Sequence, residues 1–108
     1  MDVNQLKDNI KKILDDKKAL DVEEIYVKDK TTITDYFVVA SGTSVTQIKS
    51  LSEKLEYELS NIGVNLRKIE GDKNSGWILM DYGDVIVHIF LPDVREKYSL
   101  SDFWKDKL

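Results

Sequence analysis

The sequence predicts an α/β fold in which a mixed five-stranded sheet carries its helices mainly on one face. Three observations indicate this fold. Residues 76–91 are typical of two strands around a tight turn, residues 35–70 of a strand, a helix and a strand in succession, and residues 2–20 of an amphipathic helix. Because a strand–helix–strand unit joins parallel strands and a hairpin joins antiparallel ones, the sheet is expected to contain both directions.

Composition favours one soluble domain spanning residues 1–108. Of the 108 residues 42% are hydrophobic, enough for a single core. The sequence shows no cysteine, no signal-peptide pattern and no apolar run of membrane-spanning length, so we expect a cytoplasmic protein without a membrane partner. Lys and Arg total 16 against 20 Asp and Glu, a net charge of -4. That balance argues against direct nucleic-acid binding and favours a basic protein partner.

The first half of the chain predicts a helix and two strands. Asp2 is expected to cap a helix over residues 2–20, and residues 23–29 are expected to form an edge or near-edge strand. Residues 35–41 are apolar on both alternating faces, which predicts a strand in the middle of the sheet. The helical stripe of the first segment consists of Val3, Leu6, Ile10, Ile13 and Leu14.

A second helix is predicted between an N-terminal capping signal and a C-terminal glycine. Ser44 and Gln47 have the spacing of a capping box, and Gly63 supplies a C-terminal stop, so the helix is expected over residues 45–62. Residues 64–70 then predict a strand, followed by a polar loop over residues 71–76.

The hairpin over residues 76–91 is expected to turn at Tyr82-Gly83, because glycine adopts a positive φ at no steric cost. This turn predicts Asp81 opposite Asp84 and Trp77 opposite His88. One face of the hairpin is wholly apolar and is expected to face the core: Ile78, Met80, Val85, Val87 and Ile89.

The other face of the hairpin mixes aromatic, aliphatic and charged side chains, which is typical of a protein-binding patch. An alternative is that a helix lies over Trp77 and Phe90 and leaves the acids in solvent. The side chains on this face are Trp77, Leu79, Asp81, Asp84, Ile86, His88 and Phe90.

Pro92 predicts a short helix over residues 92–97, since proline suits a first helical turn. Ser99 or Ser101 is expected to cap a further turn that carries Phe103 and Trp104, and these aromatics are expected to dock onto the domain.

The chain contains three motifs in order: Asp-Tyr-Phe-Val-Val-Ala-Ser-Gly-Thr-Ser at residues 35–44, Gly-Trp-Ile-Leu-Met-Asp-Tyr-Gly-Asp-Val-Ile-Val-His-Ile-Phe at residues 76–90, and Arg95 with Tyr98, Leu100 and Trp104. Together these motifs resemble the ribosomal silencing factor family, also called RsfS or Iojap. The resemblance implies a nucleotidyltransferase-like fold and a non-catalytic factor without a cofactor or metal. It also implies docking on the large ribosomal subunit through ribosomal protein L-fourteen, which blocks joining of the small subunit and represses translation during starvation.

The hairpin face and the resemblance together predict a partner-binding site formed by Trp77, Leu79, Asp81, Tyr82, His88 and Phe90. Trp77, Leu79 and Phe90 are expected to be apolar anchors, and Asp81 and His88 to make directional polar contacts. The tyrosine at the turn is expected to reach outward.

Two other hypotheses belong to different classes. In an enzymatic one, the helix start at residues 42–44 holds a phosphate, and Glu70 and Asp72 hold Mg²⁺ for nucleotide transfer. The glycine between these two acids is expected in a loop, which weakens the metal site. In the other, the face of Trp77 and Phe90 forms a homodimer.

Overall fold

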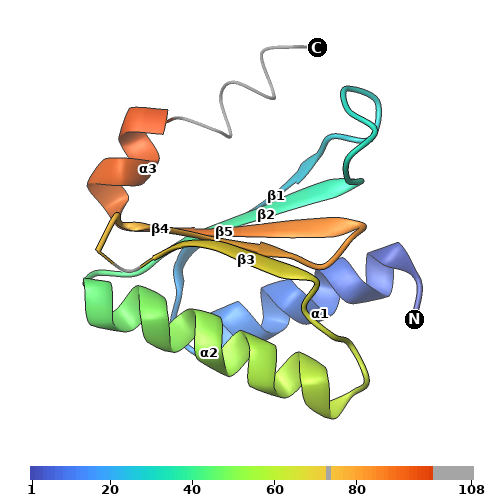
Figure 1. The fold of residues 1–108 in the computed structure, drawn as a ribbon, viewed down its shortest axis with the longest axis horizontal. Coiled ribbons are helices and arrows are strands. Elements are labelled where there is room, and N and C mark those ends of the chain that lie inside the picture. The colour runs from blue at the N-terminus through green and yellow to red at the C-terminus, as the bar shows by residue number, and fades with distance from the viewer. Residues whose placement is uncertain (73, 99–108) are drawn as a thin grey trace.

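The computed structural model describes residues 1–72 and 74–98, and it confirms the α/β fold with a mixed five-stranded sheet. Helices α1 and α2 lie on one side of the sheet, and α3 lies on the other side (Figure 1). The helices are α1 (Val3–Asp16), α2 (Val45–Asn61) and α3 (Pro92–Tyr98). The strands are β1 (Leu20–Tyr26), β2 (Tyr36–Ser41), β3 (Lys68–Asp72), β4 (Trp77–Asp81) and β5 (Val85–Phe90).

The strand order is β1-β2-β5-β4-β3; β2 and β5 pair in parallel, and the other neighbours pair antiparallel. Two antiparallel steps separate β5 from β3, so β3 runs in the direction of β2, and α2 forms the predicted parallel crossover. That crossover spans two intervening strands. The middle of the sheet is therefore β5, not β2 as expected, because pairing between distant segments sets strand position and local alternation does not encode it.

The β4–β5 hairpin differs from the prediction in its register. Trp77 lies opposite Phe90, not opposite His88 as expected. The pairing is shifted by two residues, and because this number is even, each side chain keeps its predicted face. The predicted core-facing residues of the hairpin all belong to the buried cluster on the side of α1 and α2: Ile78, Met80, Val85, Val87 and Ile89.

The shift originates at the turn. The Tyr82 N–H donates to the Val85 carbonyl at 3.0 Å, so the turn residues are Gly83 and Asp84. Gly83 has a φ of 90°, and its N–H donates to Oδ1 of Asp81 at 2.7 Å. The expectation that Tyr82 reaches outward is wrong: its side chain is 6% exposed and belongs to the core cluster. Burial raises the pKa of this phenol above its usual range.

Helix α1 begins at its predicted cap and ends earlier than expected. Asp2 and Gln5 form a reciprocal capping box, with hydrogen bonds of 2.8 and 3.0 Å. The helix ends at Asp16 because Lys18 adopts a φ of 68°. The N–H groups of Lys18 and the next residue donate back to carbonyls of the last turn, as in a Schellman motif. A lysine at this left-handed position carries no recognisable stop signal.

Helix α2 is capped by Ser44, whose Oγ accepts from the Gln47 N–H at 3.1 Å. The predicted capping box is only half formed, because the Gln47 side chain accepts instead from the Thr43 hydroxyl, at 2.9 Å, and from the Thr43 N–H. Gly63 follows the helix with a φ of 85° and ends it as predicted.

Strands β1 and β3 are displaced from their predicted ranges. The expected edge position of β1 is confirmed, but this strand lies three residues earlier than predicted. An irregularity between Leu20 and Glu23, where Asp21 has a φ of 49°, obscures its alternation. Strand β3 begins four residues later than predicted, because Val64 and Leu66 pack against the core from the connection before the strand.

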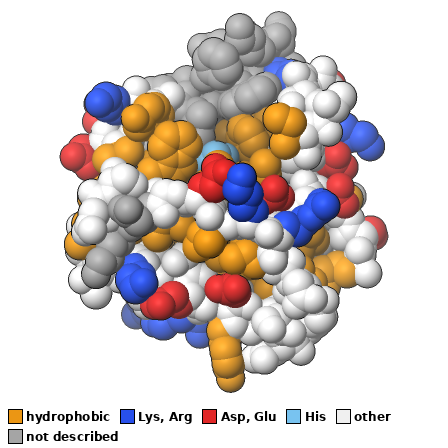
Figure 2. All heavy atoms as spheres, in the orientation of Figure 1, with side chains coloured by type: hydrophobic (Ala, Val, Ile, Leu, Met, Phe, Trp, Pro, Cys, Tyr) orange, Lys and Arg blue, Asp and Glu red, His pale blue; other side chains and the backbone are white. Residues whose placement is uncertain are grey.

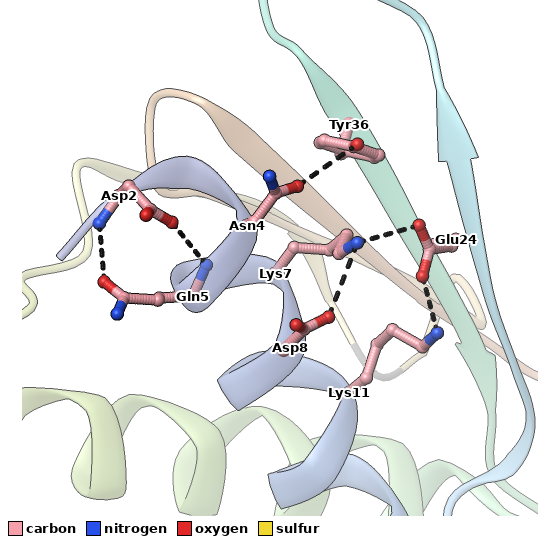
Figure 3. A network of polar contacts seen from close by, with 8 residues as sticks. All are labelled: Asp2, Asn4, Gln5, Lys7, Asp8, Lys11, Glu24 and Tyr36. Atoms are coloured by element: carbon pink, nitrogen blue, oxygen red, sulfur yellow. Dashed lines mark hydrogen bonds and ion pairs between the residues drawn. The ribbon is translucent and has the colours of Figure 1, made fainter.

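A polar network ties α1 to β1 (Figure 3). The two carboxylate oxygens of Glu24 accept hydrogen bonds from Lys7, at 3.0 Å, and from Lys11, at 2.7 Å. Burial favours a higher pKa for the Glu24 carboxyl, but these two hydrogen bonds outweigh it and hold the pKa below its usual value. Lys7 also lies over the ring of Tyr36, 4.8 Å from its centre. The network holds the start of the chain against β1 and β2.

Helix α3 confirms the predicted helix after Pro92. The expected turn capped by Ser99 or Ser101, with Phe103 and Trp104 docked, lies outside the described residues. No helix within residues 1–72 and 74–98 combines the length and the apolar character that crossing a membrane requires.

Candidate partner-binding site

The site lies on the face of the sheet opposite α1 and α2, here called the open face. Strand pairing places on it alternate residues of four strands, which include the predicted patch. These side chains are Phe37 of β2, Ile86, His88 and Phe90 of β5, Trp77, Leu79 and Asp81 of β4, and Glu70 of β3.

Helix α3 covers one end of the open face, so the alternative of a helix over Trp77 and Phe90 holds for part of the patch. Val94 packs against the buried cluster that contains Phe90, and the rings of Tyr98 and Trp77 lie 4.8 Å apart. Arg95 ties the helix to β2 through a hydrogen bond of 3.1 Å from Nη1 to Oγ of the buried Ser41.

A hollow of about 260 Å³ lies beside this helix on the open face. Its aromatic and aliphatic walls come from Trp77, Leu79 and Tyr98, and all three side chains remain partly exposed. Strand β3 contributes Glu70 and Gly71 to the lining, and Ser75 also lines the hollow. A hollow with apolar walls suits an aliphatic or aromatic side chain of a partner.

A hydrogen bond and a ring contact with residues of β5 fix the side chain of Trp77. Its indole Nε1 donates to Nδ1 of His88 at 3.1 Å, and its ring lies 5.0 Å from that of Phe90. Because an indole N–H can only donate, Nδ1 accepts, and a neutral imidazole carries its proton on Nε2. In Figure 2 the histidine is visible at the base of a gap between hydrophobic side chains, with acidic and basic side chains in front of it.

The imidazole of His88 is 4% exposed, and burial lowers its pKa to about 4. The Phe37 ring meets it edge to face at 4.8 Å, and the Phe90 ring stacks at 6.0 Å. Among the residues that the structure describes, Nε2 of His88 has no hydrogen-bond partner. At neutral pH this histidine is therefore an uncharged support for Trp77, and because it is buried it cannot make the directional contact with a partner that we expected.

The predicted site residues differ in how deeply they are buried. Trp77, Leu79 and Asp81 are partly exposed on the open face. Phe90 is fully buried, so it cannot be the exposed apolar anchor that we expected; it packs beneath Trp77 instead. The Tyr82 side chain lies on the core side of the sheet. Except for Tyr82, alternation predicted the face of these residues, but burial depends on α3, whose position the local pattern does not encode.

Two residues that line the hollow were not predicted from the sequence as part of the site. Glu70 joins the site because β3 pairs with β4 and places it opposite Leu79, and Tyr98 joins because α3 folds back over Trp77. Phe37 was missed as well, although its position in an alternating strand is a signal that could have placed it on the open face.

The residues of the enzymatic hypothesis are not brought together. The helix start at residues 42–44 follows β2, whereas Glu70 lies in β3, three strand spacings or roughly 14 Å across the sheet. Glu70 forms an ion pair of 2.7 Å with Lys68, and Gly71 belongs to β3 rather than to a loop. Within the described part of the chain, no three His, Cys, Asp or Glu side chains gather where they could hold a metal ion.

Solved structures of two bacterial proteins have the same fold as this chain. The chain superposes on a crystal structure of a protein from Chromobacterium violaceum with a TM-score of 0.92 and 31% identity, covering 97% of this chain and 88% of the other. A protein structure from Bacillus halodurans gives a TM-score of 0.82, also at 31% identity, with 94% of each chain covered. The open face thus belongs to an α/β fold shared with bacterial proteins of similar size.

The family follows from sequence comparison. The family described as "Ribosomal silencing factor during starvation" matches residues 1–108. The ribosomal silencing factor RsfS of Zymomonas mobilis is 40% identical over 84% of this chain and 68% of its own length, and that of Bacillus subtilis is 33% identical over 85% and 78%. The chloroplastic protein Iojap of Arabidopsis thaliana is 34% identical over 86% of this chain and 39% of its own. The chain belongs to the ribosomal silencing factor family.

Proposed function

We propose that this protein represses translation by binding the large ribosomal subunit through ribosomal protein L-fourteen and sterically blocking joining of the small subunit. Membership of the ribosomal silencing factor family supports a regulatory role at the ribosome. The bound protein acts as an obstacle and needs no catalytic step, cofactor or metal.

The observation that carries the proposal is the hollow on the open face, where the apolar side chains of Trp77 and Leu79 remain partly accessible. A partly exposed tryptophan beside an apolar hollow has the character of an interface hot spot. Its side chain is already oriented by His88, so binding loses little side-chain freedom.

The predicted site residues take two kinds of role in this proposal. Trp77, Leu79 and Asp81 contact the partner, whereas His88 and Phe90 hold the tryptophan from beneath. The buried tyrosine of the hairpin supports the site from the core side. A stable interface buries about 800 Å² per partner, so neighbouring parts of the open face must contribute as well.

The sequence charge of -4 supports a basic ribosomal protein as the partner. Opposite charge accelerates encounter and disfavours wrong partners more than it adds affinity. The association rate is therefore expected to fall as salt rises, while the tryptophan contact governs dissociation.

The test measures binding of the full chain to isolated large subunits and, in the same preparation, their joining with small subunits. Wild type should bind and block joining, and Trp77→Ala should weaken binding by roughly 30-fold, the loss typical of a hot spot. Tyr57→Ala is the control, because this aromatic side chain is 69% exposed on α2, away from the open face. Circular dichroism of each variant verifies folding.

Three results would contradict the proposal. If wild type binds and joining proceeds, the protein is not a steric obstacle; if Trp77→Ala binds like wild type, the open face is not the contact. A wild type that does not bind at all would redirect attention to Mg²⁺-dependent nucleotide binding, tested with Glu70→Gln.

A further inference from the structure

Strand β3 forms one edge of the sheet. It pairs with β4 on one side, and within the described residues no strand lies on its other side. Backbone N–H and C=O groups of an edge strand that point away from the sheet are free to pair with another extended chain. This edge also borders the proposed docking face, since Glu70 lines the hollow beside Trp77.

A second hollow lies on the opposite face of the same edge. Its volume is about 390 Å³, and it lies between Ile69 and helix α2, which packs against α1, β4 and β5. Gly71 borders both hollows. The side chains around the second hollow are Lys49, Ser52, Glu53, Glu56, Ile69, Asn74 and Ile78. Thus one hollow lies beside β3 on each face of the sheet. A strand added next to β3 would point its side chains alternately toward these two faces.

The two hollows differ in chemistry. The one on the open face has Trp77, Leu79 and Tyr98 as walls and suits an apolar side chain. The one beside α2 carries two glutamates and one lysine. Lys49 lies 3.7 Å from Glu53, which leaves the Glu56 carboxylate to meet a cation from outside.

The side chain of Ile69 is suited to the same cation. It is 51% exposed at the border of the second hollow. A partner lysine or arginine could pack its aliphatic stem on Ile69 while its charged head reaches Glu56.

The other edge of the sheet does not offer this arrangement. Strand β1 is interrupted between Leu20 and Glu23, where the register shifts and Asp21 has a positive φ. Such a bulge is one of the devices that prevent an edge from accepting a further strand.

We propose that the edge of β3 binds an extended, basic segment of the ribosomal protein partner by strand addition. Alternate side chains of that segment are apolar, entering the hollow beside Trp77, and cationic, lying over Ile69 toward Glu56. Backbone hydrogen bonds to β3 supply affinity, and the two hollows select the alternation. The inference rests on the proposed function, because it takes the partner to be the protein that meets the open face.

A peptide experiment tests the strand itself. The probe is a seven-residue peptide that alternates lysine and leucine, with a control peptide of the same composition in which the leucines and lysines form two blocks. The alternating peptide should bind the full chain and slow hydrogen exchange at least tenfold for those amides of residues 68–72 that point away from β4. The block peptide should bind at least tenfold more weakly.

Methylated peptides separate backbone pairing from side-chain contact. Two versions of the alternating peptide carry N-methyl groups on alternate residues, so that each blocks one edge of the peptide. One version should lose binding and the other should keep it. Equal binding of the two versions, or unchanged exchange in β3, would overturn strand addition.

A matched pair of variants tests the edge on the ribosome. Ile69→Lys places a positive charge where the partner's cation would lie, whereas Ile62→Lys alters an equally exposed isoleucine at the end of α2; both are 51% exposed. Ile69→Lys should weaken binding to isolated large subunits at least tenfold, and Ile62→Lys should leave it unchanged.

The outcomes distinguish the inference from the proposed function. If Ile69→Lys binds like wild type while Trp77→Ala does not, the edge inference is wrong and the proposed function stands. If wild type does not bind large subunits, the proposed function is wrong, and only the peptide experiment then tests strand addition to β3. If β3 amides become protected at high protein concentration without a partner, a second copy occupies the edge, which overturns the proposed occupant.

Discussion

The indole Nε1 of Trp77 donates a hydrogen bond of 3.1 Å to Nδ1 of His88, from β4 to the neighbouring β5. This bond orients the partly exposed tryptophan through a side chain, His88, that is itself only 4% exposed. The proposed contact surface therefore depends on a buried imidazole that stays neutral. Substitutions at these two residues should change the free energy of unfolding and the affinity for large subunits by different amounts.

Trp77→Phe should lower the free energy of unfolding by about 1–2 kcal/mol, because it leaves the buried Nδ1 of His88 without a donor. The phenyl ring can still pack between Phe90 and Tyr98, so binding to large subunits should fall less than for Trp77→Ala. Urea denaturation followed by circular dichroism measures the first effect, and sedimentation with subunits the second. Unchanged stability would show that the hydrogen bond contributes nothing.

Stability should decrease as the pH falls below 6.5. The pKa of His88 is about 4 in the folded protein and about 6.5 when unfolded, so between these values the unfolded chain binds more protons and acid favours unfolding. From pH 6.5 to 5.5 the loss should be about 1 kcal/mol. His88 is the only histidine in the sequence, so His88→Gln should remove this slope. Equal slopes for wild type and variant would contradict the assignment.

Lys18→Gly should stabilise the fold by about 0.5–1 kcal/mol, because Lys18 holds a left-handed φ of 68° that glycine adopts without a steric cost. Lys17→Gly is the control, since its φ of -93° gains nothing from glycine and its substitution should destabilise. Thermal or urea unfolding of the two variants gives the comparison. A gain from both variants would point to the loss of charge rather than to backbone strain.

Gly71→Ala should destabilise by roughly 2–3 kcal/mol and Gly63→Ala by roughly 1 kcal/mol. Both glycines have a positive φ, but a Cβ at Gly71 would lie 2.2 Å from the Trp77 carbonyl oxygen, whereas one at Gly63 meets nothing within 4 Å. Urea denaturation of the pair isolates the steric contribution at the β3–β4 edge. Equal losses would mean that the strand shifts to accommodate the methyl group.

The hairpin illustrates what a sequence pattern can predict. The face was correct for the side chains placed by alternation, because alternation is a property of the strand itself, but Tyr82 at the turn was expected to reach outward and lies on the core side. The register was wrong by two residues, because Gly83 can take its positive φ as the second residue of a turn at Tyr82-Gly83 or as the first of one at Gly83-Asp84. Only the hydrogen bond between Tyr82 and Val85 distinguishes the two.

The candidate site was predicted in part for a similar reason. Trp77, Leu79 and Asp81 were placed on the open face by alternation within one strand. The hollow also needs Glu70 from β3 and Tyr98 from α3, and these residues approach Trp77 only because the sheet and the last helix fold together.

By itself, the sequence determined the family, the kinds of element and the two chemical faces of the hairpin, because motifs, caps and alternation are local. The tertiary structure alone decided that β5 lies in the middle and β3 at the edge, that Phe90 is buried while Trp77 is accessible, and that His88 supports the tryptophan. Strand order and burial depend on contacts between segments far apart in the chain, and no local pattern specifies them.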